Sequence, residues 1–229
     1  MKRFQTGIEF LYNFIDNAKT NINYPITCAA SMAIASRLLN ENRYLEKAKE
    51  LAHKALTFIS DDGLIFGEGK PNDFITPKGC RPVDLGYNVE ESLPGLVTYG
   101  IITNDELVLS AVEKSMEAHM EFMLPDGAWD NSWGTRSNKW TSWGSRTSDG
   151  CQIGYGLLAK RNPVFEEVAY RNTKLLCACT HNGLLYGGPM YVSAGEPPCV
   201  HHTFCHAKAI ATLLEHDIQP KGGRKLPRE

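Results

Sequence analysis

Hydrophobic and polar positions follow a helical period over most of this chain. Residues 4–18 place apolar side chains on one stripe, residues 27–39 are almost all small or apolar, and residues 42–59 are apolar on one face only. A helix that is apolar on most sides is expected to be buried, whereas an amphipathic helix is expected at the surface. The pattern therefore predicts a surface helix that follows a buried one.

The same alternation recurs along the rest of the sequence. Small and apolar helices are predicted at 90–99, 150–159 and 203–215, and amphipathic helices at 105–123 and 164–180. Strand signals are few. About eight helices and almost no strand make the expected fold class all-α.

Three loops that follow surface helices share a motif of Asp or Asn, then Gly, then apolar and aromatic residues. They begin at Asp62, Asp126 and Asn182. The glycine supplies the positive-φ turn that ends a helix, and the aromatic residue is expected to fold back over the helix ends. Repeated helix pairs that cannot bury their own apolar faces indicate a solenoid or a closed ring of hairpins. An irregular helical bundle is the alternative.

In a ring of hairpins, the loops that lead from outer to inner helices gather at one face. These loops are predicted at 60–83, 124–143 and 180–200, and loops of this length are usually functional. We therefore expect the functional cleft where these loops meet the N-terminal ends of the inner helices.

Composition narrows the classes of partner. The chain has 229 residues, of which 42% are hydrophobic and 22% charged, and its net charge is -2. This charge provides no basic surface for nucleic acid or anionic lipid, and no apolar run is long enough to span a membrane. Residues 1–19 lack the apolar core of a signal peptide. The location stays open between the cytoplasm and, if a signal peptide was removed, the periplasm or the exterior. Seven cysteines, an odd number, are expected to be buried free thiols.

The first candidate site lies at the start of an inner helix, over residues 84–91. Asn88 could neutralise a carboxylate, and Tyr87 could donate or abstract a proton. The structural alternative is that Asp84 only caps the helix and that Glu91 only forms a buried ion pair.

The second candidate site is the stretch 129–149, which holds all four tryptophans among many polar residues. Aromatic faces next to Arg, Asn and Asp suit a sugar ring and its hydroxyl or carboxylate groups. Trp129 could instead plug the top of the ring, given its place in the repeat. The residues selected from this stretch are Trp129, Asp130, Trp133, Arg136, Trp140, Trp143, Arg146 and Asp149.

The third candidate site is the start of the last inner helix. His202 and His206 are four residues apart and share a helix face, so that a metal could bind there, although this spacing alone indicates a metal only weakly. No cofactor is predicted. His202 fits better as a general base or as a group that neutralises a carboxylate. One of the three histidines in this segment is expected to be a core residue.

With these residues identified, the chain resembles the α/α-toroid domains of carbohydrate-active enzymes, chiefly heparinase- and alginate-lyase-like polysaccharide lyases and six-hairpin glycoside hydrolases. The resemblance rests on the helix-pair repeat and on loops such as Asp126-Gly127-Ala128-Trp129. It implies an incomplete α/α toroid of about four hairpins over residues 1–218. Residues 219–229 would then be a polar tail or a linker to a C-terminal β domain.

The resemblance also implies site residues. Such lyases use an Asn, a Tyr, a His and often an Arg at the inner-helix rim, and the matching types here are Asn88, Tyr87, His202 and Arg146. The Asn-His pair of those families reads Asn88-Val89 in this chain, and fewer hairpins are present than those families have.

Three functions follow as expectations. The first is an enzyme that cleaves an acidic polysaccharide by β-elimination. The second is a hydrolase, which needs two carboxylates at a defined distance. Its candidates are Asp84, Glu90, Glu91, Asp130 and Asp149. The third is a non-catalytic module that binds a glycan. A prenyl-transferase or terpene-cyclase toroid is disfavoured, because the chain has no Asp-Asp-x-x-Asp metal motif.

Overall fold

The computed structural model describes residues 2–14, 21–68, 74–77, 79–130, 150–188, 190–227 and 229. In these residues the chain is mostly helical and contains one short β-hairpin, which confirms the all-α prediction. The helices are α1 (Lys2–Tyr12), α2 (Asn23–Leu39), α3 (Asn42–Leu56), α4 (Leu85–Tyr87), the π-helical turn η1 (Asn88–Ser92), α5 (Leu93–Thr103), α6 (Glu106–Met120), α8 (Cys151–Leu157), α9 (Val164–Ala178) and α10 (Val200–Glu215). The hairpin pairs β1 (Thr180–His181) with β2 (Leu184–Leu185) in antiparallel register.

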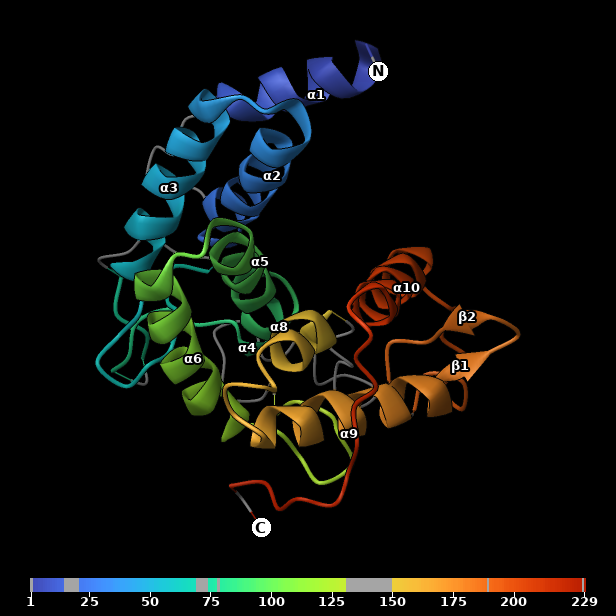
Figure 1. The fold of residues 1–229 in the computed structure, drawn as a ribbon. Coiled ribbons are helices and arrows are strands. Elements are labelled where there is room, and N and C mark those ends of the chain that lie inside the picture. Colours follow the sequence, from blue (N-terminus) through green and yellow to red (C-terminus); the bar gives the residue numbers. More distant parts are fainter. Residues whose placement is uncertain are drawn as a thin grey trace.

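The helices form an arc of two layers (Figure 1). In the inner layer α2 packs on α5, α5 on α8, and α8 on α10. In the outer layer α3, α6 and α9 each pack on the inner helix that precedes them in the chain. The predicted alternation of buried and surface helices therefore corresponds to these two layers.

One end of the inner helices is closed by short, well-capped turns. Asn40, Asn104 and Asp217 follow α2, α5 and α10, and each adopts the left-handed conformation that ends a helix, with φ of 54°, 55° and 54°. Asp105 caps α6, and its Oδ2 accepts from Tyr99 Oη at 3.0 Å and lies 2.6 Å from His53 Nε2. These contacts join α3, α5 and α6 at this end.

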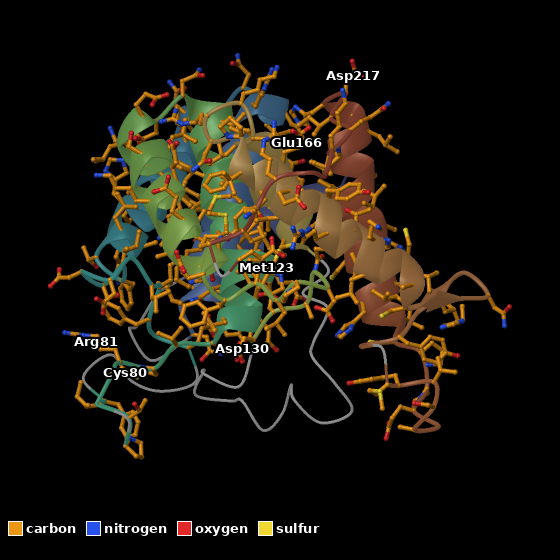
Figure 2. All side chains as sticks on the ribbon, turned by 90° about the horizontal axis from the view of Figure 1, so that it is seen from below. Cys80, Arg81, Met123, Asp130, Glu166 and Asp217 are labelled. Carbon is orange, nitrogen blue, oxygen red and sulfur yellow. The ribbon has the colours of Figure 1, made fainter. Side chains whose placement is uncertain are left out.

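The opposite end of the inner helices carries the repeated loops. Figure 2 shows Cys80, Arg81 and Asp130 at one edge of the molecule and Asp217 at the other. Beneath the loops the core is aromatic, because Trp129 packs on Tyr155 with ring centroids 5.7 Å apart, and Tyr155 packs on Phe165 at 5.2 Å.

The C-terminal residues lie along the outer helix α9. Glu167 Oε2 accepts from the backbone N–H groups of Gly223 and Arg224, and Arg171 forms ion pairs with Glu167 and Glu229. Leu226 is buried. These contacts place the segment on the arc, while its predicted role as a linker stays a prediction.

Two smaller expectations can also be compared with the structure. All seven cysteines are thiols outside disulfides, as predicted, but the expectation that they are buried holds only for Cys28, Cys151 and Cys179. Across the described ranges, no helix is both long and apolar enough to cross a membrane.

Candidate functional site

The loops and the N-terminal ends of the inner helices form one face, which we call the rim. Its described parts are residues 62–68, 79–92, 126–130, 150–152 and 199–206. The rim contains every described residue that the sequence selected for chemistry. It lies opposite the turns after α2, α5 and α10 (Figure 2).

A π-helical turn opens the central inner helix at the rim. Asp84 caps its start by accepting the N–H of Tyr87 at 3.1 Å, and the N–H of Leu93 bonds to the carbonyl of Asn88 five residues earlier. Pro94 has no N–H, so it cannot supply the donor that a regular helix would offer to the carbonyl of Glu90. Single π-helical turns of this kind occur frequently at functional sites.

Gly150, at the start of α8, packs directly on this turn. A β-carbon built on Gly150 would lie 2.5 Å from the carbonyl oxygen of Glu90, so no larger residue fits there. The end of the loop that leads into α8 is therefore fixed against η1.

Asn88 is the buried centre of the π-helical turn. Its side-chain amide donates to the carbonyl of Ile65 at 2.8 Å and to His119 Nε2 at 3.0 Å. Among the described residues, its Oδ1 has no hydrogen-bond partner. Asn88 is 0% exposed, so in this structure it positions the turn and does not reach the surface.

His119 holds Asn88 as a neutral imidazole. Its Nδ1 lies 2.7 Å from the carbonyl of Ser115, which can only accept, so the hydrogen is on Nδ1 and Nε2 accepts from Asn88. Burial without a charged partner lowers the pKa of His119 to about 4. The acceptor on Nε2 is therefore present at neutral pH.

Two carboxylates meet at Asn23, the first residue of α2. Glu68 Oε1 accepts the backbone N–H of Asn23 at 2.9 Å, and Glu91 Oε2 accepts its side-chain amide at 2.6 Å. Glu68 is fully buried, whereas Glu91 is partly exposed. Glu91, which the sequence selects, thus shares the partner Asn23 with Glu68, which the sequence analysis did not select.

A similar polar contact between the inner and the outer layer joins α8 to α9. Gln152 on α8 donates to Asn172 Oδ1 of α9 at 2.8 Å, and Asn172 donates to the carbonyl of Gly127 at 2.8 Å. Gln152 and Asn172 are both 0% exposed. Two side-chain amides at the rim are therefore each held by an outer helix, Asn88 by α6 and Gln152 by α9.

The predicted sugar-binding stretch is described only at its beginning. Trp129 is 0% exposed and packs on Tyr155, so its ring plugs the arc and has no face available for a sugar. Asp130 is partly exposed, and its N–H bonds to the carbonyl of Phe122 at 2.8 Å. The other selected residues lie outside the described residues: Trp133, Arg136, Trp140, Trp143, Arg146 and Asp149.

His202 and His206 are partly exposed on α10. Helix α8 packs on both α5 and α10 and therefore lies between these histidines and the π-helical turn. The structure brings Tyr87, Asn88 and Glu91 together with Asn23, and it places His202 on the far side of α8. Within the described ranges, no group of three or more metal-binding side chains occurs.

The sequence analysis missed His119, Asn23 and Glu68. His119 did carry a signal, because it continues the buried stripe of Val108, Val112 and Met116 on an outer helix. A polar residue in an apolar stripe needs a buried partner. The contact with Asn88 could not be foreseen, since the two residues are 31 positions apart in the sequence.

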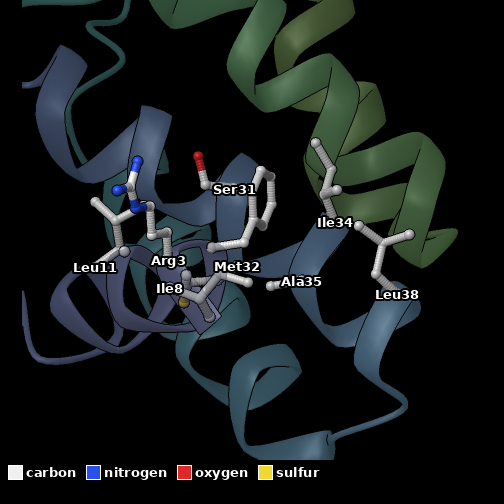
Figure 3. A pocket seen from close by; sticks show the side chains of 10 residues that line it. Arg3, Ile8, Leu11, Ser31, Met32, Ile34, Ala35 and Leu38 are labelled. Atoms are coloured by element: carbon white, nitrogen blue, oxygen red, sulfur yellow. The ribbon is translucent and has the colours of Figure 1, made fainter. Parts of the chain in front are cut away.

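A cavity of about 420 Å³ lies between α1 and α2 and is lined mostly by apolar side chains (Figure 3). Arg3 and Ser31 are polar residues in its lining. It offers apolar contacts but none of the carboxylates, tyrosines or histidines that carry proton transfer. The rim therefore remains the candidate site.

Residues 1–228 match the family described as the ulvan lyase N-terminal domain. The chain is 50% identical over 210 residues to a broad-specificity ulvan lyase of Formosa agariphila, a match that covers 91% of this chain and 33% of that protein. The chain thus spans about a third of the length of this relative.

Proposed function

Because the chain belongs to the ulvan lyase N-terminal domain family, we propose that it is the helical part of an enzyme that cleaves a polysaccharide by β-elimination at the rim. The observation that carries the proposal is the π-helical turn, which presents Tyr87 and Glu91 at the rim above the buried Asn88–His119 pair. The relative's name supports lyase chemistry over hydrolysis.

β-Elimination sets the chemical requirements of the site. A base removes the proton next to a sugar carboxylate, the electron pair forms a carbon–carbon double bond, and the bond from the ring to the glycosidic oxygen breaks. An acid then delivers a proton to that oxygen. The carboxylate must be neutralised, because negative charge develops next to it. The substrate is therefore an acidic polysaccharide that contains uronate residues.

Tyr87 is the group that we assign to proton transfer. It is partly exposed at the rim, and the capping bond to Asp84 fixes its backbone. Asn88, whose amide hydrogens are donated to Ile65 and His119, positions this turn from below. Arg146 would neutralise the sugar carboxylate. His202, which lies across α8 from Tyr87, stays the sequence-based candidate for the second proton-transfer group, and Asp149 stays a candidate carboxylate for hydrolysis. Substrate binding would involve Asp130, Trp133, Arg136, Trp140, Trp143 and His206.

One observation keeps hydrolysis as the second candidate. Glu68 and Glu91 both bond to Asn23, so two carboxylates of the rim lie close to one residue of α2. Hydrolases use such a pair as acid and base or as acid and nucleophile. Glu68 is fully buried, which disfavours contact with a substrate.

The test is an assay of the chain with polygalacturonate that follows two products, the ultraviolet absorbance of unsaturated sugars and new reducing ends. We expect both to rise together and Tyr87→Phe to lower the rate about 10²–10⁴-fold, because a positioned proton-transfer group contributes that much. Tyr170→Phe is the matched control, since Tyr170 is partly exposed on the outer helix α9. Reducing ends without absorbance would indicate a hydrolase, and binding without either product would indicate a non-catalytic module.

A further inference from the structure

Apart from the start of α10, the described segments of the rim carry many more acidic than basic side chains. Over the described residues 62–68, 79–92, 126–130 and 150–152, Arg81 is the basic residue, and it is exposed. The acidic residues of these segments are Asp62, Glu68, Asp84, Glu90, Glu91, Asp126 and Asp130. A polyanionic chain at this surface would be repelled unless cations face its charged groups.

The guanidinium group of Arg81 lies over the ring of Phe66. Its guanidinium carbon lies 4.5 Å from the ring centroid of Phe66, a cation–π contact. Phe66 is 7% exposed, its N–H bonds to the carbonyl of Phe58 at 2.9 Å, and the two rings lie 5.3 Å apart. A guanidinium held over an aromatic ring has its N–H groups in one plane, the geometry that binds a carboxylate through two hydrogen bonds.

The backbone that follows Arg81 leads into the π-helical turn. The N–H of Gly67 bonds to the carbonyl of Pro82 at 2.8 Å, and the next residues, Val83 and Asp84, are buried. Glu68 follows Gly67 and is connected to Glu91 through Asn23. Arg81 and the segment 87–91 are therefore parts of one hydrogen-bonded unit at the rim.

We propose that Arg81 binds the carboxylate of a uronate residue in the polysaccharide and so helps to select an acidic substrate. The proposal rests on the proposed function, since β-elimination requires a uronate. It adds a residue that neither the sequence analysis nor the repeat identified. Arg81 supplies positive charge where the neighbouring side chains are acidic, and the stack on Phe66 sets its orientation.

The test is calorimetric binding of the chain to polygalacturonate and to the same polymer after chemical reduction of its carboxyl groups. We expect Arg81→Ala to weaken binding to the acidic polymer about tenfold, as for loss of a charge-assisted hydrogen-bonded pair, and to leave binding to the reduced polymer unchanged. Arg81→Lys should retain part of the affinity, because lysine keeps the charge but not the two-bond geometry.

Two further variants complete the design. Arg37→Ala is the matched control, since Arg37 is exposed in the last turn of α2, at the end opposite the rim. Phe66→Leu keeps the charge but removes the aromatic ring and should give an intermediate loss. If the wild-type chain binds the acidic polymer and Arg81→Ala binds equally well, the role of Arg81 is refuted while the proposed function stands. If the wild-type chain binds no acidic polymer, both proposals fail.

Discussion

Among the described residues, the first two repeated loops are held by the next outer helix, whereas the third bonds to α10 through Leu185, whose N–H donates to Thr203 Oγ1 at 2.9 Å. The carbonyl of Gly63 accepts from Ser115 Oγ of α6 at 2.7 Å, and the carbonyl of Gly127 accepts from Asn172 of α9 at 2.8 Å. A β-carbon on Gly127 would lie 2.4 Å from the carbonyl oxygen of Arg171. Around Gly183, in contrast, the described part of the chain places no atom within 4 Å of such a β-carbon.

This difference separates the two loops whose glycine turn packs on an outer helix from the one whose glycine turn does not. The first loop contacts the π-helical turn through the bond from Asn88 to Ile65, and the second is connected to Gln152 at the start of α8 through Asn172. The third loop joins β1 to β2 and exposes His181 and Leu184. A site that positions reacting groups requires rigid support. We therefore place the chemistry next to the first two repeated loops.

The largest expected effect is that of Gly127→Ala. The residue has φ of 91°, and the added methyl group would overlap the backbone of α9. We expect the free energy of unfolding to fall by about 4 kcal/mol, since backbone overlap and a strained φ add together. Urea denaturation followed by circular dichroism measures this change. A loss below about 1 kcal/mol would show that the second loop is not held as described.

The next effect concerns pH and the buried His119. The pKa of His119 is about 4 in the folded chain and 6.5 without burial, so between these values the unfolded state binds a proton that the folded state does not. Stability is therefore complete above pH 6.5 and falls as the pH is lowered toward 4, by about 3 kcal/mol in total. His119→Gln keeps an acceptor for Asn88 but does not titrate, so its denaturation midpoint should change much less in this window. An equal pH dependence of both proteins would contradict the assignment.

The smallest effect should come from Gly183→Ala. Its φ of 77° strains any residue with a β-carbon, but within the described residues nothing crowds the added methyl group. We expect a loss of about 1 kcal/mol, the cost of the left-handed conformation alone. Gly63→Ala should lie between this variant and Gly127→Ala, since its β-carbon would lie 2.8 Å from that of Ala118. Equal losses for Gly63→Ala and Gly183→Ala would remove this distinction between the loops.

The layered architecture could be predicted because it depends on local patterns. The apolar stretches 27–39 and 150–159 and the amphipathic stretch 105–123 fall within or overlap α2, α8 and α6, and the Asp/Asn-Gly motif marks the loops. Boundaries were less accurate. The predicted helix start at residue 90 falls inside η1, and α5 begins only at Leu93, where Pro94 leaves the carbonyl of Glu90 without the donor of a regular helix.

The arrangement of the site was only partly predictable. Tyr87, Asn88 and Glu91 were selected because polar residues stood at one end of an apolar helix, and the structure places them in one turn. Their partners His119, Asn23 and Glu68 come from other elements, and such tertiary contacts leave no periodic trace in the sequence. The burial of Trp129 agrees with the structural alternative that its place in the repeat indicates, while its partner Tyr155 comes from another element.

The location of the substrate is the most direct test of this account. Hydrogen–deuterium exchange of the chain can be measured with and without oligosaccharides of polygalacturonate. We predict that the sugar slows exchange in residues 79–92 and 126–130 and leaves the turns after Asn40, Asn104 and Asp217 unchanged. Slower exchange confined to those turns, or to the cavity between α1 and α2, would contradict a substrate site at the rim.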